Sequence, residues 1–497
     1  MDACVLSLGF NDSMRLRLHR LPAVLLVWNC LALAYALDVD KLVPVRWPGG
    51  PLEVAGARAK AAIPSLDVLR GTPVSCLLVT WSGPGEAAIV RQQQQLASTY
   101  AKEARDRGFA VLGLLSAGSD PVQAVAAAVD AHLDGLALEP DFADFARLSQ
   151  AVEHAADLAV IPLQAGGGAP GIRLLTESGA AVATPTSEPW IDSNLWLVRA
   201  LRAKGPAPVW LGFALENPSV DNYVRAIADS AAAGGHWVVA PDDSLLSGLA
   251  NKQPDALATW HRITEAVGFF EEHRVWSRFA ATGSVGIVRD PTTRYPDIAD
   301  ENLNLIARRR IPYRTIDRAA ICAAALEGFK AVLATEISNP TESERSLLKT
   351  YAERGGLLVT GPWWGAAVPK ERDFLAQQLG KGQVVVYREE SPDPENLSKN
   401  LLRLVGKGNL GIRLFNAPTI LPYLSASDDG KQLLVQMINY ASGPSEAITV
   451  RVRGSYRTAR LFGLNGPAND LPVEKQEQDI ELTIEKIQTY AALVLER

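Results

Sequence analysis

Three apolar runs of this chain end in a carboxylate or lead directly to one, and this pattern constrains the fold more than any other feature. The runs cover residues 133–139, 209–216 and 236–240, and the last precedes Asp242 and Asp243. In a parallel β/α barrel the carboxyl ends of all strands open on one face, where barrel enzymes carry their catalytic groups. The pattern therefore predicts a barrel with several acids at its mouth.

Short apolar runs alternate with alanine-rich helical segments between residues 72 and 267, which is typical of repeated parallel β/α units. The runs are continuously apolar, as expected for strands buried on both faces. Seven strands are expected, over residues 76–81, 110–116, 133–139, 158–163, 180–184, 209–215 and 236–240. Helices are expected over residues 86–107, 121–131, 142–156, 194–203 and 220–233. An eighth strand is not obvious, so the barrel is either incomplete or takes a strand from residues 42–47.

A second α/β block extends from about residue 283 to residue 405. Thr341 and Glu344 form a capping box at the start of one of its helices. Its strands are expected at 284–288, 313–316, 331–334 and 357–360, and its helices at 300–310 and 342–354. This block is predicted to be a doubly wound, flavodoxin-like sheet. After residue 409 apolar residues alternate with a period of two, and Asn465-Gly466 marks a turn, which predicts a small β-sandwich.

The first 36 residues have the character of an export signal. A basic stretch around Arg15 to Arg20 precedes an apolar run at 21–33, and small residues follow at 34–36. Cleavage would give a secreted or periplasmic protein without membrane contact, and an uncleaved anchor is the alternative. With about 150 residues per domain, 497 residues suggest three domains. The expected division is signal peptide 1–36, barrel 37–278, α/β domain 279–407 and sandwich 408–497.

Charge and cysteine content exclude several classes of partner. The net charge of −6 comes without a long basic run, so nucleic acid is not an expected partner. Cys76 lies in an apolar strand and Cys322 in an alanine-rich helix, and both read as small core residues. The six histidines show no paired spacing. No metal and no cofactor are therefore predicted.

The order of barrel, flavodoxin-like sheet and small sandwich resembles family-42-type β-galactosidases and related multidomain glycoside hydrolases. The local match covers residues 331–361 and 382–387, which are similar to the amidotransferase-like trimerisation domain of those enzymes. The resemblance implies a carbohydrate substrate and a homo-oligomer. It fails at one point, because those enzymes carry an Asn-Glu pair after the fourth strand as acid/base. Here the strand counted as fourth leads to Gln164, and no Asn-Glu dipeptide occurs.

Glycoside hydrolysis needs two carboxyl groups facing each other across the scissile bond. Glu139 and Glu216 are the favoured pair, because each follows an apolar run and is followed by a turn proline. Asp141 and Asp242 are further catalytic candidates. The alternative is that an acid just past a strand caps the next helix by accepting backbone N–H groups.

Aromatic and polar residues near the expected strand ends are candidates for substrate binding, because planar rings can stack on sugar faces. The candidates are Trp81, Trp190, Trp363, Asn217 and Asp243. For the tryptophans, packing in the core or between domains is the competing interpretation. The second domain lacks a Gly-x-Cys-x-Gly elbow, so glutamine hydrolysis is not expected.

The sequence thus predicts a secreted glycoside hydrolase that acts by two-carboxylate general acid catalysis. Another class of function remains open: an inactive barrel that binds carbohydrate or takes part in assembly. A barrel lyase or epimerase would need a Lys, His or Tyr base on the same rim. His236 begins its strand and so lies at the opposite end, which argues against that third class.

Overall fold

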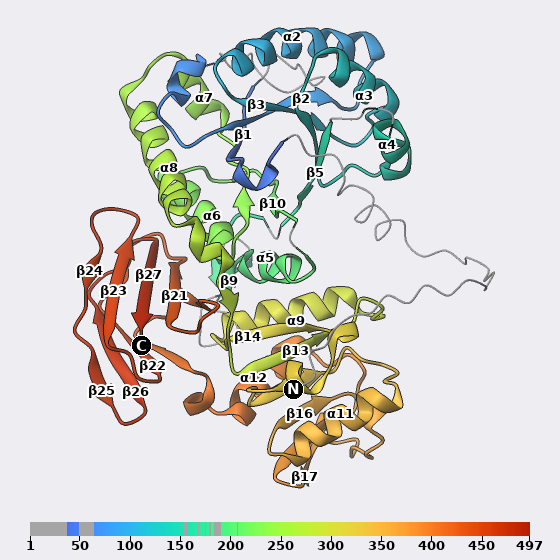
Figure 1. Ribbon diagram of the computed structural model, residues 1–497, viewed down its shortest axis with the longest axis vertical. Coiled ribbons are helices and arrows are strands. Elements are labelled where there is room, and N and C mark those ends of the chain that lie inside the picture. The colour runs from blue at the N-terminus through green and yellow to red at the C-terminus, as the bar shows by residue number, and fades with distance from the viewer. Residues whose placement is uncertain are drawn as a thin grey trace, which may run out of the picture.

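Seven parallel strands of the described chain form the barrel sheet (Figure 1). Their order is β1 (Pro44–Arg46), β2 (Cys76–Ser82), β3 (Ala110–Leu115), β4 (Gly135–Leu138), β5 (Ala159–Gln164), β10 (Trp210–Leu211) and β11 (His236–Trp237). A parallel bridge joins Val45 to Val239 and nearly closes the barrel. The strand expected within residues 42–47 is therefore confirmed as β1.

This computed structural model describes residues 37–48, 64–153, 155, 158–166, 168–173, 175–177, 180–182, 190–205 and 207–497. The predicted signal peptide, residues 1–36, lies outside the described residues. The barrel strand expected over 180–184 is wrong in its described part, because β8 (Ala180–Val182) pairs antiparallel with β7 (Leu175–Glu177) and not with the barrel. A second short antiparallel pair joins β6 (Gly171–Arg173) to β9 (Trp190–Asp192).

Helices cover the outside of the barrel. They are α2 (Ala87–Asp106), α3 (Pro121–Asp130), α4 (Phe145–Val152), α5 (Leu195–Arg202), α6 (Val220–Ala231), α7 (Asp243–Ala250) and α8 (Pro254–Glu272). Helix α4 starts three residues later than predicted because the backbone N–H of Phe142 bonds to the carbonyl of Glu139 in a turn. No helix among the described residues is long and apolar enough to span a bilayer.

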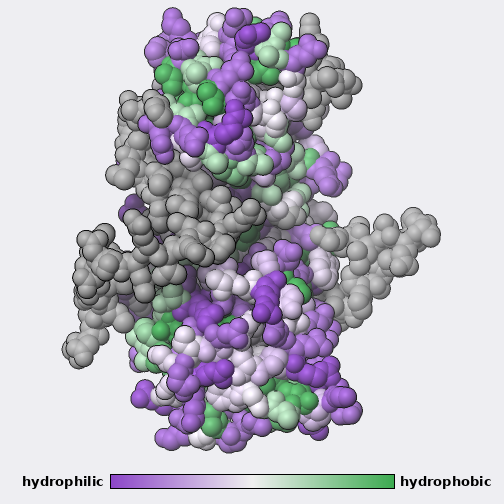
Figure 2. Space-filling view, turned by 90° about the vertical axis from the view of Figure 1, so that its right-hand side faces the viewer, coloured by the Kyte–Doolittle hydropathy of each residue, from purple (hydrophilic) through white to green (hydrophobic). Residues whose placement is uncertain are grey.

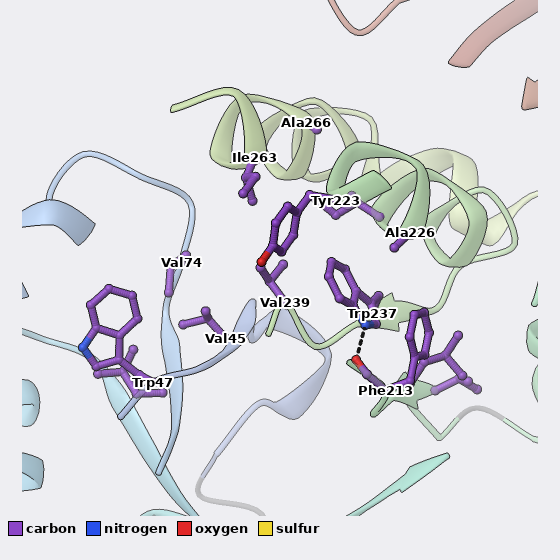
Figure 3. Close-up of a cluster of buried hydrophobic side chains, with 14 of the residues drawn as sticks. Val45, Trp47, Val74, Phe213, Tyr223, Ala226, Trp237, Val239, Ile263 and Ala266 are labelled. Carbon is purple, nitrogen blue, oxygen red and sulfur yellow. Dashed lines mark hydrogen bonds between the residues drawn. The ribbon is translucent and has the colours of Figure 1, made fainter. Parts of the chain in front are cut away.

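Aromatic side chains fill the space between the barrel and helices α6 and α8 (Figure 3). The rings of Phe213 and Trp237 stack with centroids 5.4 Å apart, and the Trp237 indole N–H donates to the Phe213 carbonyl at 3.0 Å. Tyr223 packs on the other side of Trp237 at 5.9 Å. The interior of the barrel is filled by a separate cluster of buried side chains, among them Leu78, Leu112 and Trp210, so the barrel has a packed core.

The second domain is the predicted doubly wound sheet, with one addition. Its order is β14 (Tyr313–Asp317), β13 (Val285–Arg289), β15 (Ala331–Ala334), β16 (Leu357–Thr360), β18 (Gly382–Tyr387) and β17 (Phe374–Leu379). The addition is β17, an antiparallel edge strand. Its helices are α9 (Pro296–Arg308), α10 (Ala323–Leu326), α11 (Glu342–Glu353) and α12 (Pro394–Val405). The capping box of Thr341 and Glu344 is confirmed, whereas Cys322 precedes α10 as its N-cap and does not lie inside a helix.

The third domain is a sandwich of two antiparallel sheets, as predicted. One sheet has the order β12 (Ala280–Ala281), β20 (Ile420–Ala426), β21 (Gln432–Asn439), β27 (Tyr490–Glu496), β23 (Thr458–Gly463) and β24 (Asn469–Asp470). The other has the order β19 (Ile412–Phe415), β22 (Ile448–Arg453), β26 (Asp479–Ile484) and β25 (Glu474–Gln476). Strand β12 comes from the connection between the barrel and the second domain, so that connection is fixed to the sandwich.

The sandwich and the barrel share one hydrophobic core. Leu434, Tyr440 and Tyr490 of the sandwich are buried in the same cluster as the barrel residues, and Tyr490 packs edge-on against Phe269 and Phe270 of α8. In the view of Figure 2 the described surface is mostly polar, with apolar residues in small separate groups. The sandwich residues named above are thus buried against the barrel.

Candidate active site at the barrel mouth

Glu139 directly follows the fourth strand of the barrel. The count made from the sequence began one strand too late, because β1 is only three residues long and contains a proline. With β1 included, the fourth strand is β4 and the residue after it is Glu139. This is the place where the resemblance to multidomain glycoside hydrolases implies an acid/base residue. The preceding residue is Leu138, so the asparagine of the family's pair is missing.

Arg46 crosses the barrel mouth from the end of β1 and binds Glu139 with both terminal nitrogens. Each Nη donates to one carboxylate oxygen, and the Nη2 to Oε2 distance is 2.6 Å. The two side chains retain 26% and 17% of their exposed surface, so the ion pair lies at a partly open site. Paired hydrogen bonds of this kind fix the orientation of a carboxylate as well as its position. Glu139 is therefore held in one place at the mouth.

Gly212, just after β10, provides the space for this ion pair. A Cβ atom at this position would lie 2.9 Å from the Leu163 Cβ and 3.1 Å from the Arg46 Nη2. The Nε of Arg46 is buried and has no hydrogen-bond partner among the described residues. One donor of this arginine is thus left without a partner in the described part of the chain, at a buried position beside the ion pair.

The other predicted acids have different surroundings. Glu216 is exposed in the loop after β10, and no described residue bonds to its carboxylate. Asp242 caps α7 by accepting from the N–H groups of Ser244 and Leu245, and it also accepts from the Tyr223 hydroxyl at 2.9 Å. Among the described residues, Asp242 is therefore engaged as a helix cap, whereas Glu216 remains an unbonded acid in the loop after β10.

Asp141, Asp243 and Asn217 lie near strand ends, as predicted. Asp141 accepts a hydrogen bond from the Ala117 N–H at 3.2 Å, across to the loop after β3. Asp243 is the first residue of α7 and is exposed. Asn217 is exposed too, and its carbonyl accepts from the side chain of Asn222 at 2.7 Å. Their roles in binding or catalysis stay predictions.

Trp81 is not a sugar platform in this structure. It lies inside β2, which continues to Ser82, and its ring is fully buried with the indole N–H donating to the Ala124 carbonyl at 3.0 Å. Trp81 does lie next to the last residue of its strand, as predicted, but its side chain packs outward against α3 and not into the barrel mouth. Core packing, the competing interpretation, explains this residue.

The rings of Trp190 and Trp363 both contact side chains of the second domain. Trp190 is half-buried in β9, with the guanidinium of Arg308 from the second domain 3.7 Å above its ring. Trp363 is in the second domain, where its ring packs edge-on against Trp364 at 5.7 Å. Trp190 thus contributes to the junction between two domains, and a role of either ring in substrate binding stays a prediction.

Arg46 is the site residue that sequence reasoning missed. It lies in the run Leu42-Val43-Pro44-Val45-Arg46-Trp47, where it is a single charge among apolar residues. A charge at the end of a buried run is the signal that was applied to Glu139, and it applies equally to Arg46. Among the described residues no group of three or more His, Cys, Asp or Glu side chains is arranged to hold a metal ion.

Comparisons with known proteins support the fold alone. No protein-family model matches the chain, and no curated protein matches its sequence. The α-L-fucosidase isoenzyme 2 from Paenibacillus thiaminolyticus superposes with a TM-score of 0.57 at 12% identity, over 92% of this chain and 100% of that one.

Two other glycosidases match more weakly. A β-galactosidase from Bacillus circulans sp. alkalophilus gives a TM-score of 0.42 at 10% identity, over 82% of this chain and 68% of that one. An exo-β-1,4-mannosidase from an Opitutaceae bacterium gives 0.43 at 14% identity, over 74% and 97%. Only the fucosidase is matched over its whole length with a TM-score above 0.5 among these three structures. The predicted resemblance to multidomain glycoside hydrolases is therefore confirmed at the level of the fold.

Proposed function

We propose that this chain is a secreted glycoside hydrolase in which Glu139 acts as the general acid/base and Arg46 is its positioning residue. One observation carries the proposal: a partly buried glutamate directly after the fourth barrel strand is fixed by a two-point ion pair across the mouth. Secretion is supported by the leader-like residues 1–36, and a homo-oligomer by the type of the second domain.

The chemistry expected of Glu139 is proton transfer at the glycosidic oxygen. Both oxygens of Glu139 accept from Arg46, so the lone pairs that face Arg46 are already used. In this proposal, substrate binding draws one Nη of Arg46 aside, and the oxygen that it leaves carries the proton to be donated. Glu216, in the loop after β10, is the second carboxylate of the proposal and would approach when this loop closes on the sugar.

The test compares Glu139→Gln with the wild-type protein on a panel of aryl glycosides. The panel includes an α-L-fucoside and a β-D-galactoside, because two of the structural neighbours carry those activities in their names. For 4-nitrophenyl substrates we expect kcat/KM to fall about 10²- to 10⁴-fold. With a 2,4-dinitrophenyl leaving group the loss should be much smaller, since that group departs without a proton.

Two further variants complete this experiment. Glu474→Gln alters an exposed residue of β25 in the sandwich and should leave activity unchanged. Glu216→Gln should lower kcat for both leaving groups equally if Glu216 is the second carboxylate. Equal activity of the wild-type protein and the Glu139→Gln variant on both substrate types would contradict the proposal.

A second candidate function is carbohydrate binding without hydrolysis. It is favoured by the engagement of the acids at the mouth, with Glu139 bound to Arg46 and Asp242 capping α7. In that case calorimetry would detect oligosaccharide binding to the wild-type protein while no glycoside in the panel is turned over. Glu139→Gln would then change affinity only.

A further inference from the structure

A cavity of about 620 Å³ lies at the end of the barrel opposite Glu139. Residues at the starts of two strands, Pro44 and His236, line one side of it. The ends of α5, α6 and α8 and the segment after α8 line the rest, and Gln436 of the sandwich contributes from the third domain. Its volume falls in the range of small-molecule sites, and it is separated from the mouth by the packed barrel core.

Most acids that line this cavity form ion pairs with basic residues close to them in the sequence. Asp38 pairs with Lys41 at 2.6 Å, and Glu271 pairs with Arg274 three residues along the chain. Asp40 is exposed at the rim, and its carbonyl accepts from Arg274 at 3.0 Å. One carboxylate, that of Asp40, is therefore left against the two remaining basic groups, and the lining keeps an excess of positive charge.

Arg202 and Arg278 are the basic groups without an acidic partner among the described residues. Arg202 lies in the last turn of α5, where the carbonyl ends of the helix stabilise its charge without a carboxylate. Its Nη2 donates to the Ser277 carbonyl at 3.1 Å, and no other hydrogen bond of its guanidinium is formed with a described residue. Arg278 is exposed beside the same cavity.

His236 adds a neutral group to this lining. Burial, together with Arg274 and Arg202, lowers the pKa of His236 to about 4. At neutral pH its imidazole is uncharged and can donate one hydrogen bond and accept another. The cavity therefore presents two guanidinium groups and a neutral imidazole.

The geometry points to a second binding site in this cavity, for a small anion that carries a carboxylate or a phosphate group. Guanidinium groups bind both kinds of anion through paired hydrogen bonds, and two unpaired guanidinium groups are present here. This inference goes beyond the function of the barrel mouth, because none of the residues involved belongs to the site around Glu139.

The experiment is titration calorimetry on the full chain with three probes: inorganic phosphate, glucuronate and glucose. We expect phosphate, glucuronate or both to bind. The anion that binds more tightly shows whether the site prefers a phosphate or a carboxylate group. Glucose, which matches glucuronate in size without the carboxylate, should give no heat of binding. Glu139→Gln should bind the anion as the wild-type protein does, so this site and the mouth are tested separately.

Variants locate the binding in the cavity. Arg202→Met should weaken anion binding at least tenfold, and Arg278→Met should weaken it several-fold without removing any hydrogen bond of the described structure. Arg91→Met, at an exposed position of α2, is the matched control and should bind normally. The inference is overturned if neither anion binds, if glucose binds as well as glucuronate, or if both the Arg202 and Arg278 variants bind as the wild type does.

Discussion

Single charges placed at the two ends of the barrel have opposite surroundings. At the mouth, Arg46 has a carboxylate partner on both terminal nitrogens. At the other end, Arg202 of α5 lines a cavity with the uncharged His236 and has no ion-pair partner among the described residues. The arginine at the mouth is therefore neutralised by its partner, whereas the arginine at the opposite end is not.

Because of His236, the free energy of unfolding is expected to fall at acidic pH. Its folded pKa of about 4 lies below the unfolded value of 6.5, so the unfolded state binds the proton first and stability falls as pH drops through this window. The full shift corresponds to about 3 kcal/mol, and since His236 borders a cavity we expect about 1 to 3 kcal/mol. Charged groups lining the same cavity are Asp38, Asp40, Lys41, Arg202, Glu271, Arg274 and Arg278.

The measurement is urea unfolding at pH 7 and pH 4.5. His236→Gln should lose less stability between these pH values than the wild-type protein, by the amount given above. His261→Gln alters an exposed histidine of α8 and should keep the wild-type dependence. If the His236 variant lost as much stability as the wild type, the described environment of His236 would be wrong.

At the scale of elements, the glycines differ in whether a side chain would fit at their position. Gly268 lies within α8, and a Cβ there would meet only the ring of Pro73, at 3.9 Å. Gly212 follows β10, and a Cβ there would press on Leu163 and Arg46. The same substitution should therefore have opposite effects in a helix and at a barrel end.

Gly268→Ala should raise the free energy of unfolding by about 0.5 to 1 kcal/mol, because alanine is the better helix former. Gly212→Ala should lower it by about 1 to 3 kcal/mol through overpacking. Chemical denaturation of both variants checks the prediction. A stabilising Gly212→Ala would show that the space beside Arg46 is larger than the structure indicates.

How far the sequence predicts these elements depends on their length. The long helices α2 and α6 and the strands of the second domain carry enough periodicity to be placed within a few residues. Strand β1 is three residues long and contains Pro44, so propensity alone does not reveal it, yet it sets the strand count and with it the position of Glu139. The end of the strand that carries Trp81 is predicted to within one residue, but its continuously apolar sequence does not show that the Trp81 ring faces α3.

The ion-pair and hydrogen-bond partners of the candidate acids are hard to predict from the sequence for a different reason. Arg46 and Glu139 are 93 residues apart, and their pairing follows only from closure of the barrel. Asp242 as a helix cap was an alternative open from the start, because capping needs only local order. Contacts between residues close in sequence can thus be predicted from the sequence. Contacts across the barrel become apparent only in the complete fold.

At the scale of the molecule, a buried polar joint fixes the sandwich to the barrel. Asp229 of α6 is fully buried, and burial raises its pKa. It accepts from the hydroxyls of Ser193 at 2.7 Å and Tyr440 at 2.5 Å and from the Asn194 N–H at 2.7 Å. Arg225, one turn away, donates to backbone carbonyls of the sandwich.

Tyr440→Phe removes one donor to Asp229 while keeping the ring. We expect a loss of about 1 to 3 kcal/mol, the usual cost of leaving a buried acceptor with one bond fewer. Tyr295→Phe, at an exposed tyrosine, is the control and should be neutral. Calorimetric melting checks both variants, and unchanged melting of Tyr440→Phe would mean that the joint does not stabilise the domain contact.

The pairing of β12 with β20 also orders events during synthesis. Ala280 and Ala281 leave the ribosome well before Ile420, so this edge stays without its neighbour until the final part of the polypeptide appears. The apolar faces of α6 and α8 are likewise covered only after the strands of the sandwich have been synthesised. A prematurely terminated product cannot hide these surfaces, and quality-control proteases can therefore distinguish it from the finished protein.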